Sequence, residues 1–245
     1  MACIHITRIY RAVTAGVLAF INNYQRARYM ARMDSSAYLS NTGGLTGAAD
    51  GKQLTTSFWL ASYSGTASRG VFMLGGSLML YFQRNNNSTA YIKIEESGKI
   101  QGSSTATISI PTGTTATHFY IAVDMSSTSK RFVWVNGSAV SMTWSTYNNT
   151  NLTQTGTANI GNTNTLYIES DIYDFWYTNT YLAPSTYNSK FYNGGVSPNL
   201  GSNGQIPTGT APLVYINGYG NLENRGTGGA LTTGGSITQG EAAPI

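Results

Sequence analysis

Apolar and polar residues alternate with a period of two along most of the chain. In the segment AYIKIEESGKIQG, Tyr91, Lys93 and Glu95 alternate with Ile92 and Ile94. Successive side chains of a strand point to opposite faces, so this pattern indicates a half-buried β-strand. Such strands recur at short intervals with turn residues between them, which is typical of an antiparallel sandwich. The pattern therefore predicts an all-β protein.

A hairpin is clearest in the segment THFYIAVDMSSTSKRFVWVNG. The apolar runs Phe119–Val123 and Phe132–Val135 flank a polar turn, and Asn136-Gly137 follows at once. Asn-Gly favours a two-residue hairpin turn because both residues tolerate a positive φ. We expect a three-stranded meander here, with 139–144 as its third strand.

Four other segments carry local signals. Residues 25–40 alternate and predict two paired strands around Asp34. Residues 157–179 predict one long, aromatic strand. Pro184–Asn193 predicts a short helix, because proline suits a first helical turn, and 212–216 predicts an isolated strand in Gly-rich surroundings.

Composition divides the chain into three segments. Residues 1–27 form a basic arm, 28–197 form the sandwich, and 198–245 form a Gly-rich extension that we expect to pack on the sandwich or on neighbouring chains. A sandwich of this size is commonly one domain and can bury its apolar side chains without a disulfide. The single cysteine, Cys3, cannot form an internal disulfide.

Charge is sparse, at 10% of residues, and unevenly placed. Residues 1–33 hold five arginines and no acid, a net charge of +5, whereas 34–245 hold nine Lys or Arg and ten Asp or Glu, a net charge of −1. A terminal block of like charge favours an acidic partner, but the alternation in YQRARYMARM equally fits a solvated strand face. No aromatic-interleaved motif accompanies the block, so nucleic acid is not an expected partner. The five arginines are Arg8, Arg11, Arg26, Arg28 and Arg32.

An apolar run, AVTAGVLAFI at residues 12–21, follows two of these arginines. No small-x-small cleavage site follows the run, and it is well short of the roughly 20 apolar residues that span a bilayer. We therefore expect a packed strand or short helix in the arm, with neither a cleaved signal peptide nor a transmembrane segment.

The order of the motifs resembles that of concanavalin A-like (laminin-G-like) jelly rolls. His118, the triplet at 122–124 and the triplet at 135–137 occupy the places of that family's W-H-H-V-A-V-x-D and L-Y-V-D-G motifs. The likeness covers roughly residues 28–238. It implies an antiparallel concanavalin A-like jelly-roll β-sandwich.

A closer likeness is to bacteriophage-encoded members of this fold. They share an ADGK-type loop before a Ser-Phe-Trp strand, here Ala49–Lys52, and a Gly- and Pro-containing extension, here 200–215. The resemblance implies a non-enzymatic virion structural protein on the outer surface of the phage particle, without a cofactor. Its expected partners are the major capsid protein or other virion proteins, and further copies of the chain. As a capsid decoration (cement) protein, it would bind the shell through its arm arginines. The alternative is a glycan-binding adhesin of a phage tail or fibre.

The string ESDIYD holds three candidate catalytic carboxylates, Glu169, Asp171 and Asp174. Laminarinase-type β-glucanases share the jelly roll and place two carboxylates about 5 Å apart on one strand face. Here the last acid is one methylene short, and strict alternation puts Asp174 on the face opposite the other two unless a bulge intervenes. A structural role is therefore favoured over hydrolysis, and no catalytic residue is predicted.

Metal chemistry finds little support. Two histidines, His5 and His118, and one cysteine do not supply the usual ligand set for zinc. We expect His118 to be a structural residue of a core strand. Asp34, Asp50 and Asp124 could join loop carbonyls around calcium, but no tight cluster of acids and amides surrounds them. No metal is predicted.

Sugar binding is the serious alternative to a structural role. Exposed aromatic side chains stack on pyranose rings, and Trp144, Tyr147, Trp176 and Tyr177 lie beside amide or hydroxyl side chains in the sequence. Aromatic residues on sandwich strands more often pack in the core. If exposed, these four would form the glycan-binding surface.

Overall fold

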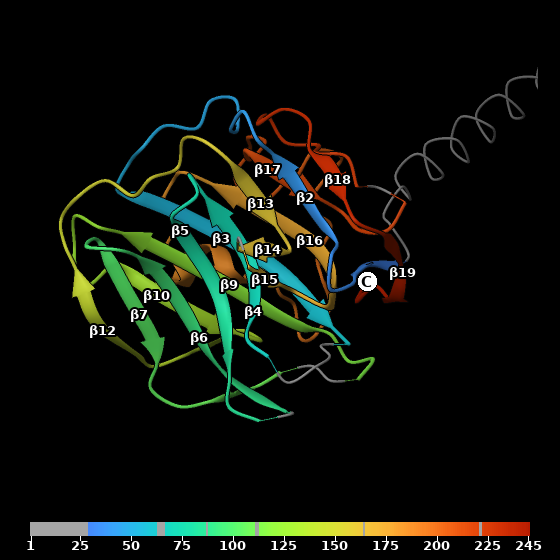
Figure 1. The fold of residues 1–245 in the computed structure, drawn as a ribbon, viewed down its shortest axis with the longest axis horizontal. Coiled ribbons are helices and arrows are strands. Elements are labelled where there is room, and N and C mark those ends of the chain that lie inside the picture. The colour runs from blue at the N-terminus through green and yellow to red at the C-terminus, as the bar shows by residue number, and fades with distance from the viewer. Residues whose placement is uncertain (1–28, 63–66, 87, 111–112, 164, 221) are drawn as a thin grey trace, which may run out of the picture.

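Two large antiparallel sheets pack face to face in the computed structural model of the chain (Figure 1). The structure describes residues 29–62, 67–86, 88–110, 113–163, 165–220 and 222–245. The arm at 1–27, with its apolar run, lies outside these residues. The predicted antiparallel β-sandwich is confirmed.

Sheet A, as far as the structure describes it, has eight strands in the order β11-β10-β9-β3-β16-β1-β19, with β17 paired to β16. The strands are β1 (Tyr29–Met33), β3 (Gln53–Ala61), β9 (Thr117–Asp124), β10 (Arg131–Val135), β11 (Ser138–Ala139), β16 (Ser170–Thr178), β17 (Val214–Ile216) and β19 (Ile237–Ala242).

Sheet B has nine strands within the described ranges, in the order β12-β7-β6-β5-β4-β13-β2-β18, with β8 paired to β6. The strands are β2 (Tyr38–Asn41), β4 (Arg69–Leu74), β5 (Leu78–Arg84), β6 (Thr89–Glu96), β7 (Ile100–Ser104), β8 (Ile108–Ser109), β12 (Met142–Tyr147), β13 (Ala158–Ile160) and β18 (Thr232–Gly234). A separate two-stranded ribbon, here called the ribbon, consists of β14 (Asn162–Thr163) and β15 (Leu166–Tyr167).

The main core lies between the two sheets. Phe58 of β3 stacks on Phe119 of β9 at 5.3 Å between ring centroids, and Phe119 meets Phe82 of β5 edge-on at 5.1 Å. Ile92 and Ile94 of β6 join this core, as their alternation with polar neighbours predicts. The inward faces of both sheets are therefore apolar, and burial of these faces holds the sheets together.

The outer face of sheet A carries a second apolar layer. The chain between β16 and β17 runs over this face and includes α2 (Pro184–Tyr187) and the 3₁₀ turn η1 (Asn188–Lys190). Proline occupies the first turn of α2, as the sequence predicts. Because sheet A is covered on both faces, β9 is buried at every position instead of alternating. The second layer includes Tyr120, Trp176, Leu182, Phe191, Leu200 and Tyr215.

The predicted meander is confirmed in its first two strands and in both of its turns, and it is wrong in the extent of its third strand. Asn136 and Gly137 adopt φ of 47° and 75° and join β10 to β11. Strand β11 is only two residues long, and 142–147 instead forms β12, which pairs with β7 in sheet B. The chain crosses from one sheet to the other at 140–141, so the third apolar run serves a different sheet.

Two further strand predictions need the same kind of correction. The segment 25–40 was expected to give a strand pair, but β1 belongs to sheet A and β2 to sheet B, with Asp34 in the turn between them. The segment 157–179 contains four strands, β13 to β16, where one was predicted. In both segments apolar alternation located the strands but did not reveal their partners.

The Gly-rich extension at 198–245 is built into both sheets. Strand β17 pairs with β16, β18 pairs with β2 at the end of sheet B, and β19 pairs with β1 at the end of sheet A (Figure 1). The extension therefore supplies the final strand at one edge of each sheet within the described residues.

Candidate functional site

A groove lies on the outer face of sheet B, beside the ribbon. Strand β5 directs Leu78, Leu80 and Phe82 into the core, so the alternate residues Met79 and Tyr81 point outward. The groove has a volume of about 370 Å³, at the lower end of the range for small-ligand sites. It is lined by Ser68, Met79, Tyr81, Gln83, Glu95, Thr163, Thr165 and Leu166.

The ribbon forms one wall of this groove. It can lie close to β4 because the β4 residue beneath the ribbon is a glycine, Gly70. A Cβ at Gly70 would collide with the carbonyl oxygen of Leu166 and with the side chain of Thr163. Tyr167 of the ribbon packs against Tyr38 of β2, with 6.3 Å between the ring centroids. The ribbon thus covers the outer face near β4 and β2 and leaves β5 and β6 open.

Tyr81 and Glu95 give the groove an aromatic ring beside a carboxylate. Tyr81 lies on β5 and Glu95 on the neighbouring strand β6, where Glu95 pairs in register with Met79, two residues before Tyr81. Burial, together with the carboxylate of Glu95, raises the pKa of the Tyr81 hydroxyl well above its ordinary value. The hydroxyl therefore remains a hydrogen-bond donor at any physiological pH.

Thr163 is an unusual member of the lining. It is 2% exposed, and its Oγ1 has no hydrogen-bond partner among the described residues. A buried hydroxyl without a partner destabilises a fold and is rare in native structures. In this structure the hydroxyl faces Gly70 beneath the ribbon.

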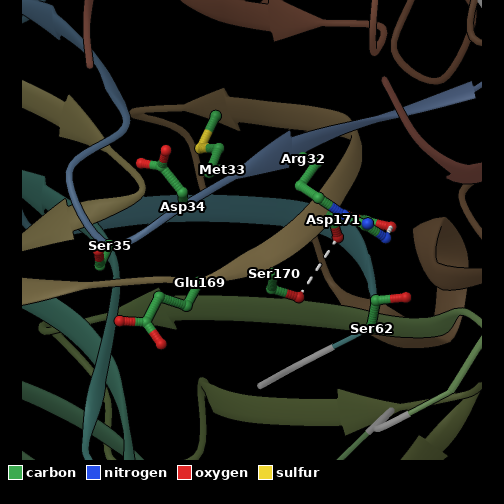
Figure 2. Close-up of a pocket in the computed structure, with 8 residues that line it drawn as sticks. All are labelled: Arg32, Met33, Asp34, Ser35, Ser62, Glu169, Ser170 and Asp171. Atoms are coloured by element: carbon green, nitrogen blue, oxygen red, sulfur yellow. Dashed lines mark hydrogen bonds and ion pairs between the residues drawn. The ribbon is translucent and has the colours of Figure 1, made fainter. Parts of the chain in front are cut away.

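A second cavity, the β1–β16 pocket, lies at the ends of β1, β3 and β16 and has a volume of about 470 Å³. Figure 2 shows Arg32 and Asp171 together at one side of it, with Asp34 and Glu169 away from this pair. No aromatic residue lines it within the described part of the chain. The lining consists of Arg32, Met33, Asp34, Ser35, Ser62, Glu169, Ser170 and Asp171.

The charged groups of the β1–β16 pocket are engaged within the chain. Arg32 donates from Nε to Asp171 Oδ1 at 2.7 Å and from Nη2 to Oδ2 at 3.0 Å. Glu169 forms an ion pair with Arg69. Hydrogen bonds from the backbone and side chain of Ser36 lower the pKa of Asp34. The pocket is thus mainly an ion-pair network that joins β1 to β16.

The three candidate catalytic carboxylates do not share one cavity. A bulge does intervene in β16, because its register against β3 shifts between Tyr173 and Trp176. Asp174 adopts φ of 45° in the bulge and is 1% exposed, with its carboxylate accepting hydrogen bonds from Tyr215 and Asn217 at 2.9 Å each. Glu169 and Asp171 line the β1–β16 pocket, whereas Asp174 is enclosed in the second layer.

Two of the four candidate sugar-stacking residues are buried, so they do not meet the condition of exposure. Trp176 is 1% exposed and donates from Nε1 to the carbonyl of Gly204 at 2.9 Å. Tyr177 is fully buried in the main core and donates its hydroxyl to Gln154. The second layer on the outer face of sheet A covers Trp176, whereas Tyr177 faces the main core between the sheets.

The other two, Trp144 and Tyr147, lie at the sandwich edge and are partly exposed. Their rings meet edge-on at 5.8 Å, and the guanidinium of Arg131 lies 5.4 Å from the Trp144 ring and 4.7 Å from the Tyr147 ring. Arg131 comes from β10 and the aromatic pair from β12, so this contact joins the two sheets. The ring faces on the side of Arg131 are therefore already occupied.

The candidate calcium ligands are separate from one another. Asp34 and Asp124 accept hydrogen bonds from the serine two residues later, and Asp50 accepts them from Gln154 and Thr155. In the part of the chain that the structure describes, no three His, Cys, Asp or Glu residues gather as metal ligands. Across the same residues, no helix has the length and apolar character needed to cross a membrane.

Of the five predicted anchor arginines, the structure describes only Arg32. Arg8, Arg11, Arg26 and Arg28 lie outside the described residues. The Arg32 guanidinium binds Asp171 and approaches Glu241 at 3.4 Å, which raises its pKa further. Arg32 thus has an intramolecular role that the sequence did not indicate.

No protein-family model matches this chain, and no curated protein matches its sequence. Solved structures do match. The native heptameric SAP-like pentraxin from Limulus polyphemus has a TM-score of 0.59 at 12% identity, covering 88% of this chain and 96% of that one. A putative carbohydrate binding protein from Bacteroides ovatus ATCC 8483 has a TM-score of 0.62 at 12% identity, covering 89% of this chain and 62% of that one. The present chain thus spans less than two thirds of the Bacteroides protein, and both likenesses establish the lectin-like jelly-roll fold that the sequence resemblance implies.

Proposed function

We propose that this protein is a glycan-binding module whose binding surface is the groove on sheet B. The observation that supports this most is the composition of the lining. An outward aromatic ring, Tyr81, and the apolar side chains of Met79 and Leu166 adjoin the amide of Gln83 and the carboxylate of Glu95. Sugar rings present apolar C–H faces and peripheral hydroxyls, so they require this combination of apolar surface and fixed polar groups.

The fold is compatible with this proposal. One of the two solved structures described above is a putative carbohydrate binding protein, although at 12% identity the likeness extends to the fold alone. The groove is preferred over the β1–β16 pocket because the charged groups of that pocket are engaged within the chain. It is preferred over the Trp144 edge because Arg131 already covers those rings.

We further propose that the module binds its glycan without hydrolysing it. The groove contributes one carboxylate among its lining residues, Glu95. Glycoside hydrolysis ordinarily requires two carboxylates at one site. The acids of ESDIYD lie elsewhere, with Asp174 enclosed by Tyr215 and Asn217.

Location in a bacteriophage virion, as a capsid decoration protein or as an adhesin, stays a prediction of the sequence resemblance. The decoration role depends in part on the arm at 1–27, which lies outside the described residues. Of the two roles, glycan adhesion is the one that the groove supports. Homo-oligomerisation likewise stays a prediction.

The proposal predicts that Tyr81→Ala reduces glycan binding at least tenfold, because the ring supplies the main apolar contact with the sugar. The measurement is binding of the labelled protein to a broad glycan array, followed by titration of the tightest ligand. Tyr219→Ala is the matched control, since Tyr219 is 38% exposed and is not part of the groove lining. We expect this control to bind as the wild type does.

Trp144→Ala tests the site predicted from sequence in the same titration. If this variant loses binding and Tyr81→Ala retains it, the glycan binds at the sandwich edge and the groove is not the site. If the wild type binds no glycan on the array, the proposed function is wrong.

A further inference from the structure

The groove is closed at one end. A row of outward side chains crosses sheet B from Met73 of β4 through Met79 of β5 and Glu95 of β6 to Gln101 of β7. Met73 is 1% exposed, whereas Gln101 is exposed. The ribbon lies against β4, so the row is covered at its β4 end. A ligand chain in the groove therefore meets a wall on that side.

The opposite side is open and polar. Beyond β6 the outer face presents Gln101 and Ser103 of β7, followed by Thr143 and Ser145 of β12. These side chains are short or flexible, and three of the four are exposed. A chain of sugars can leave the groove in this direction without meeting another wall.

Thr163 marks the closed end. Its hydroxyl packs toward Gly70 without a hydrogen-bond partner. A rotation of about 120° about χ1 places the hydroxyl where the methyl stands and the methyl where the Cβ hydrogen stands, so Oγ1 can turn away from Gly70. A sugar hydroxyl at the wall could then pair with Oγ1, which removes the cost of the unpaired group.

We infer that the groove recognises the terminal unit of a glycan, with Thr163 hydrogen-bonding a hydroxyl of that unit and the rest of the glycan running out over β6, β7 and β12. This inference rests on the proposed glycan-binding function and specifies its ligand class. An internal stretch of glycan would need two open ends, and the ribbon closes one.

The test uses linear hexasaccharides of glucose, N-acetylglucosamine, galactose and mannose, each immobilised in two ways. One set is coupled through the reducing end and the other through the non-reducing terminal unit. We expect the full-length protein to bind its preferred sugar at least tenfold more tightly in one coupling than in the other. Equal binding in both couplings overturns terminal recognition and leaves the glycan-binding function standing. No binding to either set overturns both.

Thr163→Val tests the contact at the wall, because it keeps the shape of the side chain and removes the hydroxyl. We expect this variant to bind the glycan in its preferred coupling about tenfold more weakly, because about one hydrogen bond is lost. We also expect an unchanged or higher unfolding midpoint, since an unpaired buried hydroxyl has been removed. Thr105→Val is the control, because Thr105 lies outside the groove lining and its Oγ1 donates to the carbonyl of Ser141 at 3.2 Å. Unchanged affinity of Thr163→Val contradicts the assigned role of Thr163.

Discussion

Replacing Asp174 with alanine will lower the free energy of unfolding by about 3–5 kcal/mol. The carboxylate is 1% exposed and accepts hydrogen bonds from Ser197, Tyr215 and Asn217. Alanine leaves these three donors buried without that acceptor. It also places a residue that disfavours positive φ at a backbone position with φ of 45°. Urea denaturation monitored by tryptophan fluorescence measures the loss.

Asp174→Asn separates the two causes. Asparagine tolerates the left-handed backbone and keeps one acceptor oxygen, so we expect a smaller loss of about 1–2 kcal/mol. Glu223→Ala is the matched control for removing an acid, because Glu223 is exposed, and we expect a change within about 0.5 kcal/mol. A loss below about 1 kcal/mol for Asp174→Ala would show that the bulge of β16 does not depend on this carboxylate.

Mild acid will destabilise the protein through His118. The imidazole is fully buried, Nε2 lies 2.8 Å from Ser57 Oγ, and the ring packs against both Trp59 and Tyr192. Burial lowers its pKa to about 3, whereas an unfolded histidine titrates near about 6.5. The unfolded state therefore takes up the proton first. Stability from the neutral ring is complete above about pH 6.5 and falls as the pH drops toward 3.

Between about pH 6.5 and about pH 5 we expect the free energy of unfolding to fall by roughly 2 kcal/mol. The folded state lowers the pKa values of Asp34, Asp50 and Asp124. Their contribution to the free energy of unfolding is therefore lost only when the pH falls below about 4, the pKa of an unfolded aspartate. Urea titrations at a series of pH values measure the slope. His118→Gln removes the titrating group and should flatten the slope in this window. The same slope in both proteins would mean that His118 is not its cause.

Much of the fold follows from local pattern. The alternation in β5 and β6 has one physical cause, a sheet with one face in the core and one face in solvent, and it identifies the inward residues correctly. The Asn136-Gly137 turn forms because both residues accept a positive φ. Pro184 begins the short helix for an equally local reason. These features depend on a few neighbouring residues, so the sequence alone predicts them.

Features that depend on distant segments could not be predicted in this way. Strand β16 is buried on both faces because 179–213 folds back over sheet A, and nothing within ESDIYDFWYTN indicates that cover. Trp176, a candidate for sugar stacking if exposed, is buried by this cover. The crossover at 140–141 similarly moves β12 to another sheet, since apolar alternation gives the faces of a strand but not its partner.

The groove was partly visible in the sequence. The outward positions Tyr91, Lys93 and Glu95 of β6 are evident from alternation, and Glu95 lines the groove. Its ribbon wall was not visible, because 157–179 looked like one strand. The wall requires Gly70, ninety-odd residues upstream of Thr163, to allow the close approach. Such a contact between distant residues appears only in the folded chain.

An NMR titration locates the binding site directly and so tests whether a glycan binds in the groove on sheet B. The isotope-labelled protein is titrated with the tightest oligosaccharide from the array, and amide shifts are followed residue by residue. We expect the largest shifts to cluster at Tyr81, Glu95 and Thr163. Saturable shifts centred instead on Trp144 and Tyr147, or on Arg32 and Glu169 in the β1–β16 pocket, would contradict it.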